Sequence, residues 1–164
     1  MRVFLDTEFT DFTDPRLISA GLVAEDGQEF YCELAEGWGI ADCSHFVYHF
    51  VLPLLENTHR LTRTEAGKAL VAWLVTLGDS LTVVFDVRED WRLFIDLIAP
   101  YRAANLKLAA HWLNDWTTPV GTRRHAILES ILSDEDRRHH ALVDARALRE
   151  AVLRTESEFK KRSF

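Results

Sequence analysis

The first part of the chain alternates apolar runs with polar turns, which is the pattern of β-strands. Residues 2–5 form a short apolar run that ends at Asp6, and residues 17–24 are apolar almost throughout. The acidic turn signal that ends at Gly27 predicts a hairpin, with residues 29–34 as its returning strand. These three runs predict an antiparallel meander.

Further along the chain, apolar positions three and four residues apart predict helices. Five helical stripes begin near residues 44, 64, 89, 123 and 139, and the last runs to about residue 160. Pro53 is expected to kink the first helix, Gly78 to end the second and Pro100 to stop the third. Residues 81–85 and 106–113 predict two more strands.

This order of elements predicts the α/β class, with a mixed five-stranded sheet flanked by helices. A length of 164 residues suits one domain over residues 1–164, and 48% apolar residues supply a sizeable core.

Composition and charge narrow the classes of function. No stretch of 18 apolar residues and no signal-peptide pattern is visible, and Cys32 and Cys43 form neither a metal-ligand pair nor a disulfide framework. We therefore expect a cytoplasmic protein that does not associate with membranes. The net charge of −7 disfavours tight, non-specific binding to long nucleic acid, although divalent cations can supply positive charge locally.

The first candidate for chemistry follows the first strand. Strand alternation places Asp6 and Glu8 on one face of the sheet, where two close carboxylates resist ionising together unless a cation lies between them. A solvated strand end is the alternative interpretation.

The second candidate is the acidic turn between the fourth strand and the third helix. It contains Asp86, Glu89 and Asp90. Carboxylates are also favourable in a first helical turn for electrostatic reasons, so this segment taken alone has a structural explanation.

The third candidate is the start of the last helix. Asp144 falls near the apolar side of that helix, and His139 precedes it by five residues. Pairing of Asp144 with a nearby arginine is the alternative.

Taken together, the three segments predict one catalytic edge of the sheet. Carboxylates gathered in one place require divalent cations, and oxygen ligands suit Mg²⁺ or Mn²⁺. Two such ions about 3.5–4 Å apart can hold a phosphodiester for in-line attack. A neutral histidine near pH 7 is a suitable base for the attacking water.

The three segments VFLDTEF, VVFDVREDWRLF and HHALVDA resemble the exonuclease motifs of the DEDDh superfamily. That superfamily includes oligoribonuclease, RNase T and the proofreading domains of polymerases, and the resemblance is strongest to small bacterial 3′→5′ exoribonucleases with a DTEF first motif. It implies an RNase H-like fold and a 3′→5′ exonuclease that releases nucleoside 5′-monophosphates with two Mg²⁺ ions, for which Mn²⁺ can substitute.

The resemblance also implies a role for each matching metal-ligand position. Asp6 would bridge both metals, Glu8 and Asp144 would complete the ligands of one, and Asp90 would bind a metal directly or through water. In the second motif Asp86 occupies a position where the family often has Asn, so it is an alternative to Asp90.

The remaining roles concern the base and the substrate. His139 would be the general base, with His140 as the alternative. Thr7 and Phe9 would lie along the terminal nucleotide. Stacking of Trp112 or Trp116 on a base is a further possibility, with packing as the alternative.

The expected partner is the 3′ end of single-stranded RNA. DNA is the alternative substrate, and a catalytically silent RNase H-like nucleic-acid-binding module is the alternative outside enzymes. A homodimer is expected as well, because close relatives commonly pair and because residues 46–55 and 70–77 offer much apolar surface.

Overall fold

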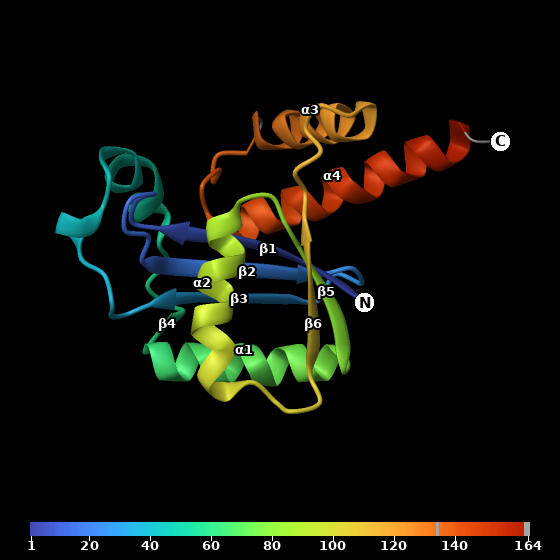
Figure 1. The fold of residues 1–164 in the computed structure, drawn as a ribbon. Helices are drawn as coiled ribbons and strands as arrows, with labels where there is room; N and C mark the ends of the chain where they lie inside the picture. The colour runs from blue at the N-terminus through green and yellow to red at the C-terminus, as the bar shows by residue number, and fades with distance from the viewer. Residues whose placement is uncertain (134, 163–164) are drawn as a thin grey trace.

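A mixed sheet of six strands forms the centre of the molecule (Figure 1). The computed structural model describes residues 1–133 and 135–162. The strand order is β4-β3-β2-β1-β5-β6. The strands are β1 (Arg2–Phe9), β2 (Leu17–Ala24), β3 (Glu29–Leu34), β4 (Arg60–Leu61), β5 (Ser80–Phe85) and β6 (Lys107–Trp112).

The pairing of these strands confirms the predicted meander and the α/β class. β1 is antiparallel to β2 and β2 to β3, whereas β5 runs parallel to β1 and to β6. The predicted count of five strands was wrong, because β4 pairs with Glu33 and Leu34 of β3. A strand of two residues is too short to show an alternating pattern, so only its tertiary pairing identifies it.

Four helices cover the two faces of the sheet (Figure 1). The helix α1 (Arg63–Leu77) and the helix α2 (Arg88–Ile98) pack on one face. The helices α3 (Pro119–Ser133) and α4 (Ala141–Arg162) pack on the other. Short 3-10 turns lie at Ile40–Asp42, Leu52–Leu54 and Ala99–Tyr101.

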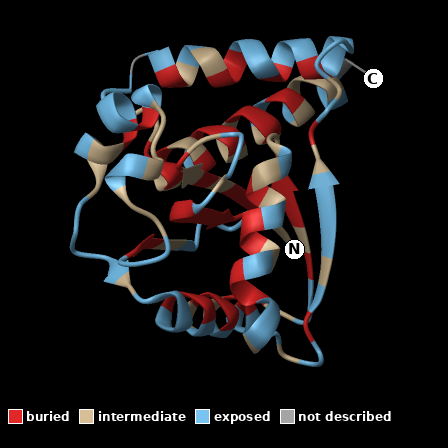
Figure 2. Cartoon of the chain, turned by 60° about the vertical axis from the view of Figure 1, so that its left-hand side comes forward, coloured by how far each residue is buried: buried red, intermediate tan, exposed pale blue. Residues whose placement is uncertain are grey.

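Each face of the sheet has its own apolar core, and the buried residues line the inner sides of the helices in Figure 2. In β1, Val3 and Leu5 pack with α1 and α2, and Phe4 between them packs with α3 and α4. This alternation follows from the period of two in a strand. Among the described residues, no helix is long and apolar enough to cross a membrane.

Three predicted helices differ from the observed ones. The helix predicted to begin near residue 123 begins at Pro119, because the Thr118 hydroxyl accepts from the Gly121 amide and proline suits a first helical position. The segment predicted at 44–56 contains a π-helical turn at Val47–Val51 and then a 3-10 turn, rather than one kinked α-helix. Pro53 lies in that 3-10 turn and has no amide hydrogen to continue an α-helical ladder. The last helix begins at Ala141 rather than at His139, whose positive φ of 73° is not helical.

A glycine brings the start of α4 against the sheet. Gly21 lies opposite Asp6 in the β1–β2 ladder. A Cβ atom at Gly21 would lie 2.3 Å from backbone atoms of Ala141 and Leu142, so only a glycine permits this approach. The contact places the segment that carries His139 and Asp144 directly over the end of β1.

Candidate metal centre

The acid pair of the first motif lies at the end of β1. Asp6 pairs with Gly21 and Glu8 with Ser19, and a bulge follows between Glu8 and Phe9. Both carboxylates line one cavity together with Asp90 and Asp144. The structure therefore brings the carboxylates of all three motifs to one place.

Asp90 occupies the first turn of α2 and is only 1% exposed. The Thr7 hydroxyl donates a hydrogen bond of 2.7 Å to its Oδ1 atom. Its Oδ2 atom is buried and has no hydrogen-bond partner among the described residues. A buried carboxylate oxygen without a partner is costly, so Asp90 requires a proton or a cation. This orphaned oxygen fits a divalent-metal site.

The third motif is held by its own backbone. The His139 amide donates to both oxygens of Asp144, at 3.3 and 3.2 Å. The left-handed backbone of His139 turns the chain immediately before α4, and the imidazole lines the same cavity as the acids. Backbone strain of this kind is often found at functional sites.

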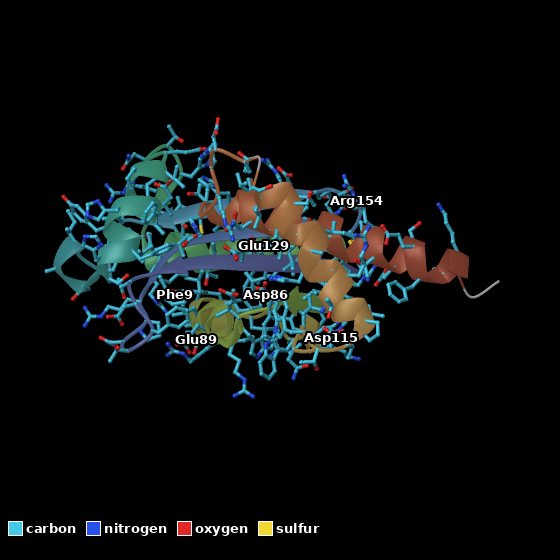
Figure 3. The ribbon with its side chains drawn as sticks, turned by 90° about the horizontal axis from the view of Figure 1, so that it is seen from above. Phe9, Asp86, Glu89, Asp115, Glu129 and Arg154 are labelled. Atoms are coloured by element: carbon cyan, nitrogen blue, oxygen red, sulfur yellow. The ribbon has the colours of Figure 1, made fainter. Side chains whose placement is uncertain are left out.

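The potential ligand atoms form two neighbouring groups. One contains Glu8, His139 and Asp144, and the other contains Asp6, Asp86 and Asp90, with the atoms of each group within 4.8 Å of one another. Figure 3 shows Asp86 in the turn after β5 and Phe9 at the end of β1. Asp86 and Asp90 both belong to the ligand group of Asp6, so the structure brings both acids of the second motif to the site.

Burial and mutual repulsion raise the pKa values of these acids. Burial raises the pKa of Asp6 and Glu8 well above the ordinary range, and neighbouring carboxylates raise both further. Burial likewise raises the pKa of Asp90 to about 8 and that of Asp144 to about 7. Without a cation, the cluster therefore holds protons near neutral pH.

These shifts predict how metal binding depends on pH. In EDTA, the free energy of unfolding should fall as pH rises through about 7 and about 8, because the folded cluster binds protons that the unfolded chain has already released. Mg²⁺ or Mn²⁺ removes this repulsion. We expect millimolar Mg²⁺ to raise the Tm by at least about 5 °C at pH 8.5, and by clearly less at about pH 6. Differential scanning calorimetry measures both shifts, and equal shifts at the two pH values would contradict the assignment.

An aromatic wall borders the acids. The cavity has a volume of about 410 Å³, and Phe9, Phe12 and Phe46 line it beside the carboxylates. The rings of Phe9 and Phe12 meet edge to face at 5.0 Å, and the Phe46 ring meets His139 edge to face at 4.8 Å. Phe12 is 73% exposed and Phe46 48% exposed, so their ring faces are available to a flat ligand.

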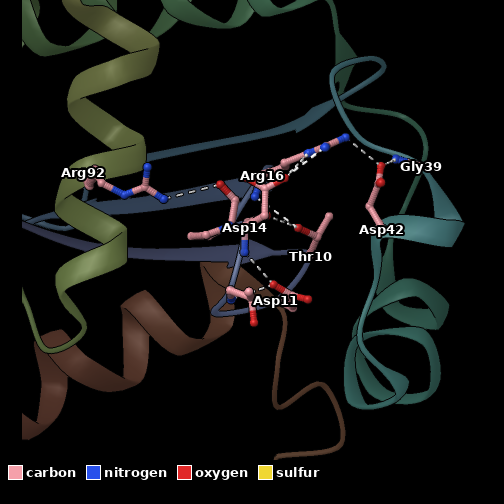
Figure 4. A network of polar contacts seen from close by, with 9 residues as sticks. Thr10, Asp11, Asp14, Arg16, Gly39, Asp42 and Arg92 are labelled. Atoms are coloured by element: carbon pink, nitrogen blue, oxygen red, sulfur yellow. Dashed lines mark hydrogen bonds and ion pairs between the residues drawn. The ribbon is translucent and has the colours of Figure 1, made fainter.

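Polar contacts fix the loop that carries Phe12 (Figure 4). The Asp11 carboxylate accepts from the amides of Thr13 and Asp14, at 2.7 and 2.8 Å. Arg16 binds the carboxylates of Asp14 and Asp42, and the latter contact ties the loop to the Ile40–Asp42 turn. These contacts hold the loop, and with it Phe12, in a defined position beside the cavity.

The other residues considered from the sequence lie elsewhere. His140 is 3% exposed, stacks on Tyr31 at 4.4 Å, and does not line the cavity of the acids. Trp112 donates to the Asp86 carbonyl at 3.0 Å and lies under the Arg88 guanidinium, which is a packing role. Trp116 is 39% exposed.

Sequence reasoning missed Phe12 and Phe46 as cavity residues. Phe46 belongs to a helical apolar stripe, where burial is the ordinary expectation. Phe12 stands in a polar loop between acidic residues, and this position was the available signal.

No protein-family model matches this chain, and no curated protein matches its sequence.

Proposed function

We propose that this chain is a metal-dependent 3′→5′ exonuclease of the DEDDh type that acts on single-stranded nucleic acid, with RNA as the preferred substrate. One observation carries the proposal. Three distant segments bring four carboxylates and a histidine to one cavity beside an aromatic wall, and these residues are Asp6, Glu8, Asp90, Asp144 and His139. The RNase H-like fold belongs to the same proposal, supported by the mixed sheet with helices on both faces.

Asp6, Glu8, Asp90 and Asp144 would hold two Mg²⁺ ions, for which Mn²⁺ can substitute. The fit rests on the oxygen-only carboxylate set and on the unpartnered Oδ2 atom of Asp90. When bound, the ions would supply positive charge to the phosphodiester and to the attacking and leaving oxygens.

His139 suits the role of general base. Partial burial and the charge of Arg138 lower its pKa, so the imidazole is neutral at pH 7 and can accept a proton. Its ring lies in the ligand group of Glu8 and Asp144, next to the proposed position of the phosphodiester. The bound amide of His139 holds this segment in place.

The cavity favours an unpaired terminal nucleotide. Phe9, Phe12 and Phe46 offer aromatic faces for its base or sugar, and Thr7 lines the same space. Stacking of this kind requires an unpaired base, so a duplex end must first fray. With a net charge of −7, affinity has to come from the last few nucleotides rather than from a long polyanion.

Preference for RNA needs a group that recognises the 2′-hydroxyl. Glu8 lines the same cavity as the aromatic residues, and its carboxylate can accept that hydrogen bond. This part of the proposal makes RNA the substrate and DNA the alternative.

One gel tests the proposed function. We expect a 5′-labelled single-stranded RNA to shorten one nucleotide at a time in Mg²⁺, with nucleoside 5′-monophosphates as products and no reaction in EDTA. A DNA strand and a blunt RNA duplex of the same sequence should react more slowly. Cleavage of a circular strand would indicate an endonuclease, and binding without any hydrolysis would indicate a silent binding module.

We also propose a homodimer, although the structure leaves less apolar surface exposed for pairing than the sequence suggests. Leu70 and Leu74 of α1 are fully buried in the core of their own chain, so of the residues 70–77 mainly Val75, which is 40% exposed, offers apolar surface. Tyr48 and Phe50 remain about half exposed outside the cavity of the acids and supply apolar surface for pairing. Light scattering at micromolar concentration should give twice the mass of 18.9 kDa, and a monomer would contradict the proposal.

We also propose a cytoplasmic location. Cys32 and Cys43 are both free thiols in the structure, which suits a reducing compartment. Measurement of the subcellular distribution of the native protein tests this assignment.

A further inference from the structure

A second cavity lies on the other side of the acid cluster. It has a volume of about 280 Å³. Asp6 and Asp144 line both cavities, and Asp86 of the same ligand group lines the second. Its remaining wall comes from the loop after β6, from α3 and from the segment before α4. Trp116, His125, Glu129 and Arg138 line that wall. Figure 3 shows Glu129 on α3 and Asp86 in the turn after β5, two of the residues that face this cavity.

Trp116 presents a large aromatic surface at this cavity. Its side chain is 39% exposed, although indole is among the most favourable groups to bury. The indole and the His125 ring pack at right angles, with centroids 5.4 Å apart and planes at 88°. The Thr122 hydroxyl donates to the Trp116 carbonyl at 3.0 Å. The indole is therefore held in one place while part of it stays open.

The loop under Trp116 is anchored to α3. The Asp115 carboxylate pairs with the buried guanidinium of Arg124, and the Thr118 hydroxyl donates to the Asp115 carbonyl at 2.9 Å. Gly121 lies so close that an added Cβ would stand 2.0 Å from the Asp115 carbonyl oxygen. A rigid loop that holds an exposed aromatic ring is preorganised for stacking, because little entropy is lost on binding.

We propose that this second cavity is a nucleoside subsite, in which Trp116 stacks on the base of the penultimate nucleotide. The inference rests on the proposed exonuclease function and adds a length requirement to it. The terminal nucleotide occupies the aromatic cavity of Phe9, Phe12 and Phe46, and the bond to be cleaved lies at the carboxylates that both cavities share.

Both signs of charge line the second cavity, which has the carboxylates of Asp6, Asp86, Glu129 and Asp144 and the guanidinium of Arg138. Arg138 lines it and binds Glu129 through two contacts of 3.1 and 3.0 Å, so its guanidinium is fixed at the rim. His125 adds a second nitrogen group there. Glu129 offsets part of the charge of Arg138, so the stack of the base on Trp116, rather than an attraction for phosphate, carries the proposed subsite.

The arrangement makes a dinucleotide the smallest good substrate. A nucleoside 5′-monophosphate fills only the first cavity, whereas a 5′-phosphorylated dinucleotide fills both. The ring of Trp116 therefore contributes to binding of dinucleotides and longer strands and contributes nothing to binding of the product.

The test compares wild type, Trp116→Ala and Trp116→Phe, all in Mg²⁺. We expect Trp116→Ala to raise KM for a 5′-phosphorylated diribonucleotide by about 5- to 150-fold, as the loss of one base–aromatic stack does. The inhibition constant of the mononucleotide product should stay unchanged, and Trp116→Phe should recover most of the loss. Phe12→Ala is the matched control, because it alters the first cavity alone and should weaken mononucleotide and dinucleotide together.

An unchanged KM in Trp116→Ala, or a parallel rise in the product's inhibition constant, would overturn the subsite. Binding of the dinucleotide to Asp6→Asn protein, with and without Trp116→Ala, separates this inference from the proposed function. If the dinucleotide binds in a Trp116-dependent manner while wild type hydrolyses nothing, the subsite stands and the exonuclease proposal fails. If hydrolysis occurs and binding ignores Trp116, the reverse holds.

Discussion

Asp6→Asn is expected to lower kcat on a single-stranded 3′ end by about 10³-fold or more, which corresponds to about 4 kcal/mol of transition-state stabilisation. Asp6 stands at the centre of the acid cluster, since its pKa is raised by burial and then by the charges of four other acids. These are Asp90, Glu8, Asp144 and Asp86. An amide at this position keeps the shape of the side chain and would remove a ligand charge from the proposed metal site.

Stability separates this effect from misfolding. Removal of one buried negative charge relieves repulsion in the metal-free protein, so Asp6→Asn should have a higher Tm than wild type in EDTA at about pH 8. The increase in Tm on addition of Mg²⁺ should shrink. Glu89→Gln is the matched control, because Glu89 shares the first turn of α2 with Asp90 but belongs to neither ligand group. Turnover near that of wild type in folded Asp6→Asn protein would remove the basis of the metal-site assignment.

Much of the sheet follows from the sequence because its strands are apolar runs bounded by turns. The runs at Leu17–Ala24 and Glu29–Leu34 coincide with β2 and β3. The β4 strand does not follow in the same way, because a pair of residues carries no period and forms only when the chain returns beside β3. The helical segment predicted at 44–56 exists in part, but its change from π to 3-10 geometry depends on packing around Val47 and Val51.

The candidate site also contains residues that the sequence predicts and residues that only the structure reveals. The acids were visible in sequence because three separate segments place them at strand ends and helix starts, and Asp6 at the end of the first strand is one example. The aromatic walls were visible only in part. Stacking of Trp116 on a base was considered beside packing, whereas Phe46 looks like a core residue until the structure leaves it exposed. The contact of Gly21 with the start of α4 was equally hidden, since it joins residues 120 positions apart.

The two adjacent histidines of the third motif have different surroundings in the structure. His139 lines both cavities and lies in a ligand group with Glu8 and Asp144. His140 is buried on the far side of the turn, stacked on Tyr31, and neither of its ring nitrogens has a hydrogen-bond partner among the described residues. Its nearest acidic atom is the Glu56 Oε1, at 3.6 Å.

We therefore expect His139→Ala to lower kcat by about 10²–10⁴-fold, the usual contribution of a positioned base. The increase in Tm on addition of Mg²⁺ and the affinity for the mononucleotide product should largely persist. At Mg²⁺ concentrations that saturate the acid cluster at every pH, the wild-type rate should fall at acidic pH, where the imidazole is protonated. Because partial burial and Arg138 lower the pKa of His139, that fall should begin below the ordinary histidine range, and His139→Ala should lack it.

His140→Ala should act on stability instead. Loss of a buried ring that packs on Tyr31 should lower the free energy of unfolding by about 1–3 kcal/mol, with little change in the rate of the folded protein. Urea unfolding and steady-state kinetics on both variants measure the two effects side by side. If His140→Ala instead abolishes turnover while His139→Ala only destabilises, the base is His140 and the turn before α4 must rearrange in the active enzyme.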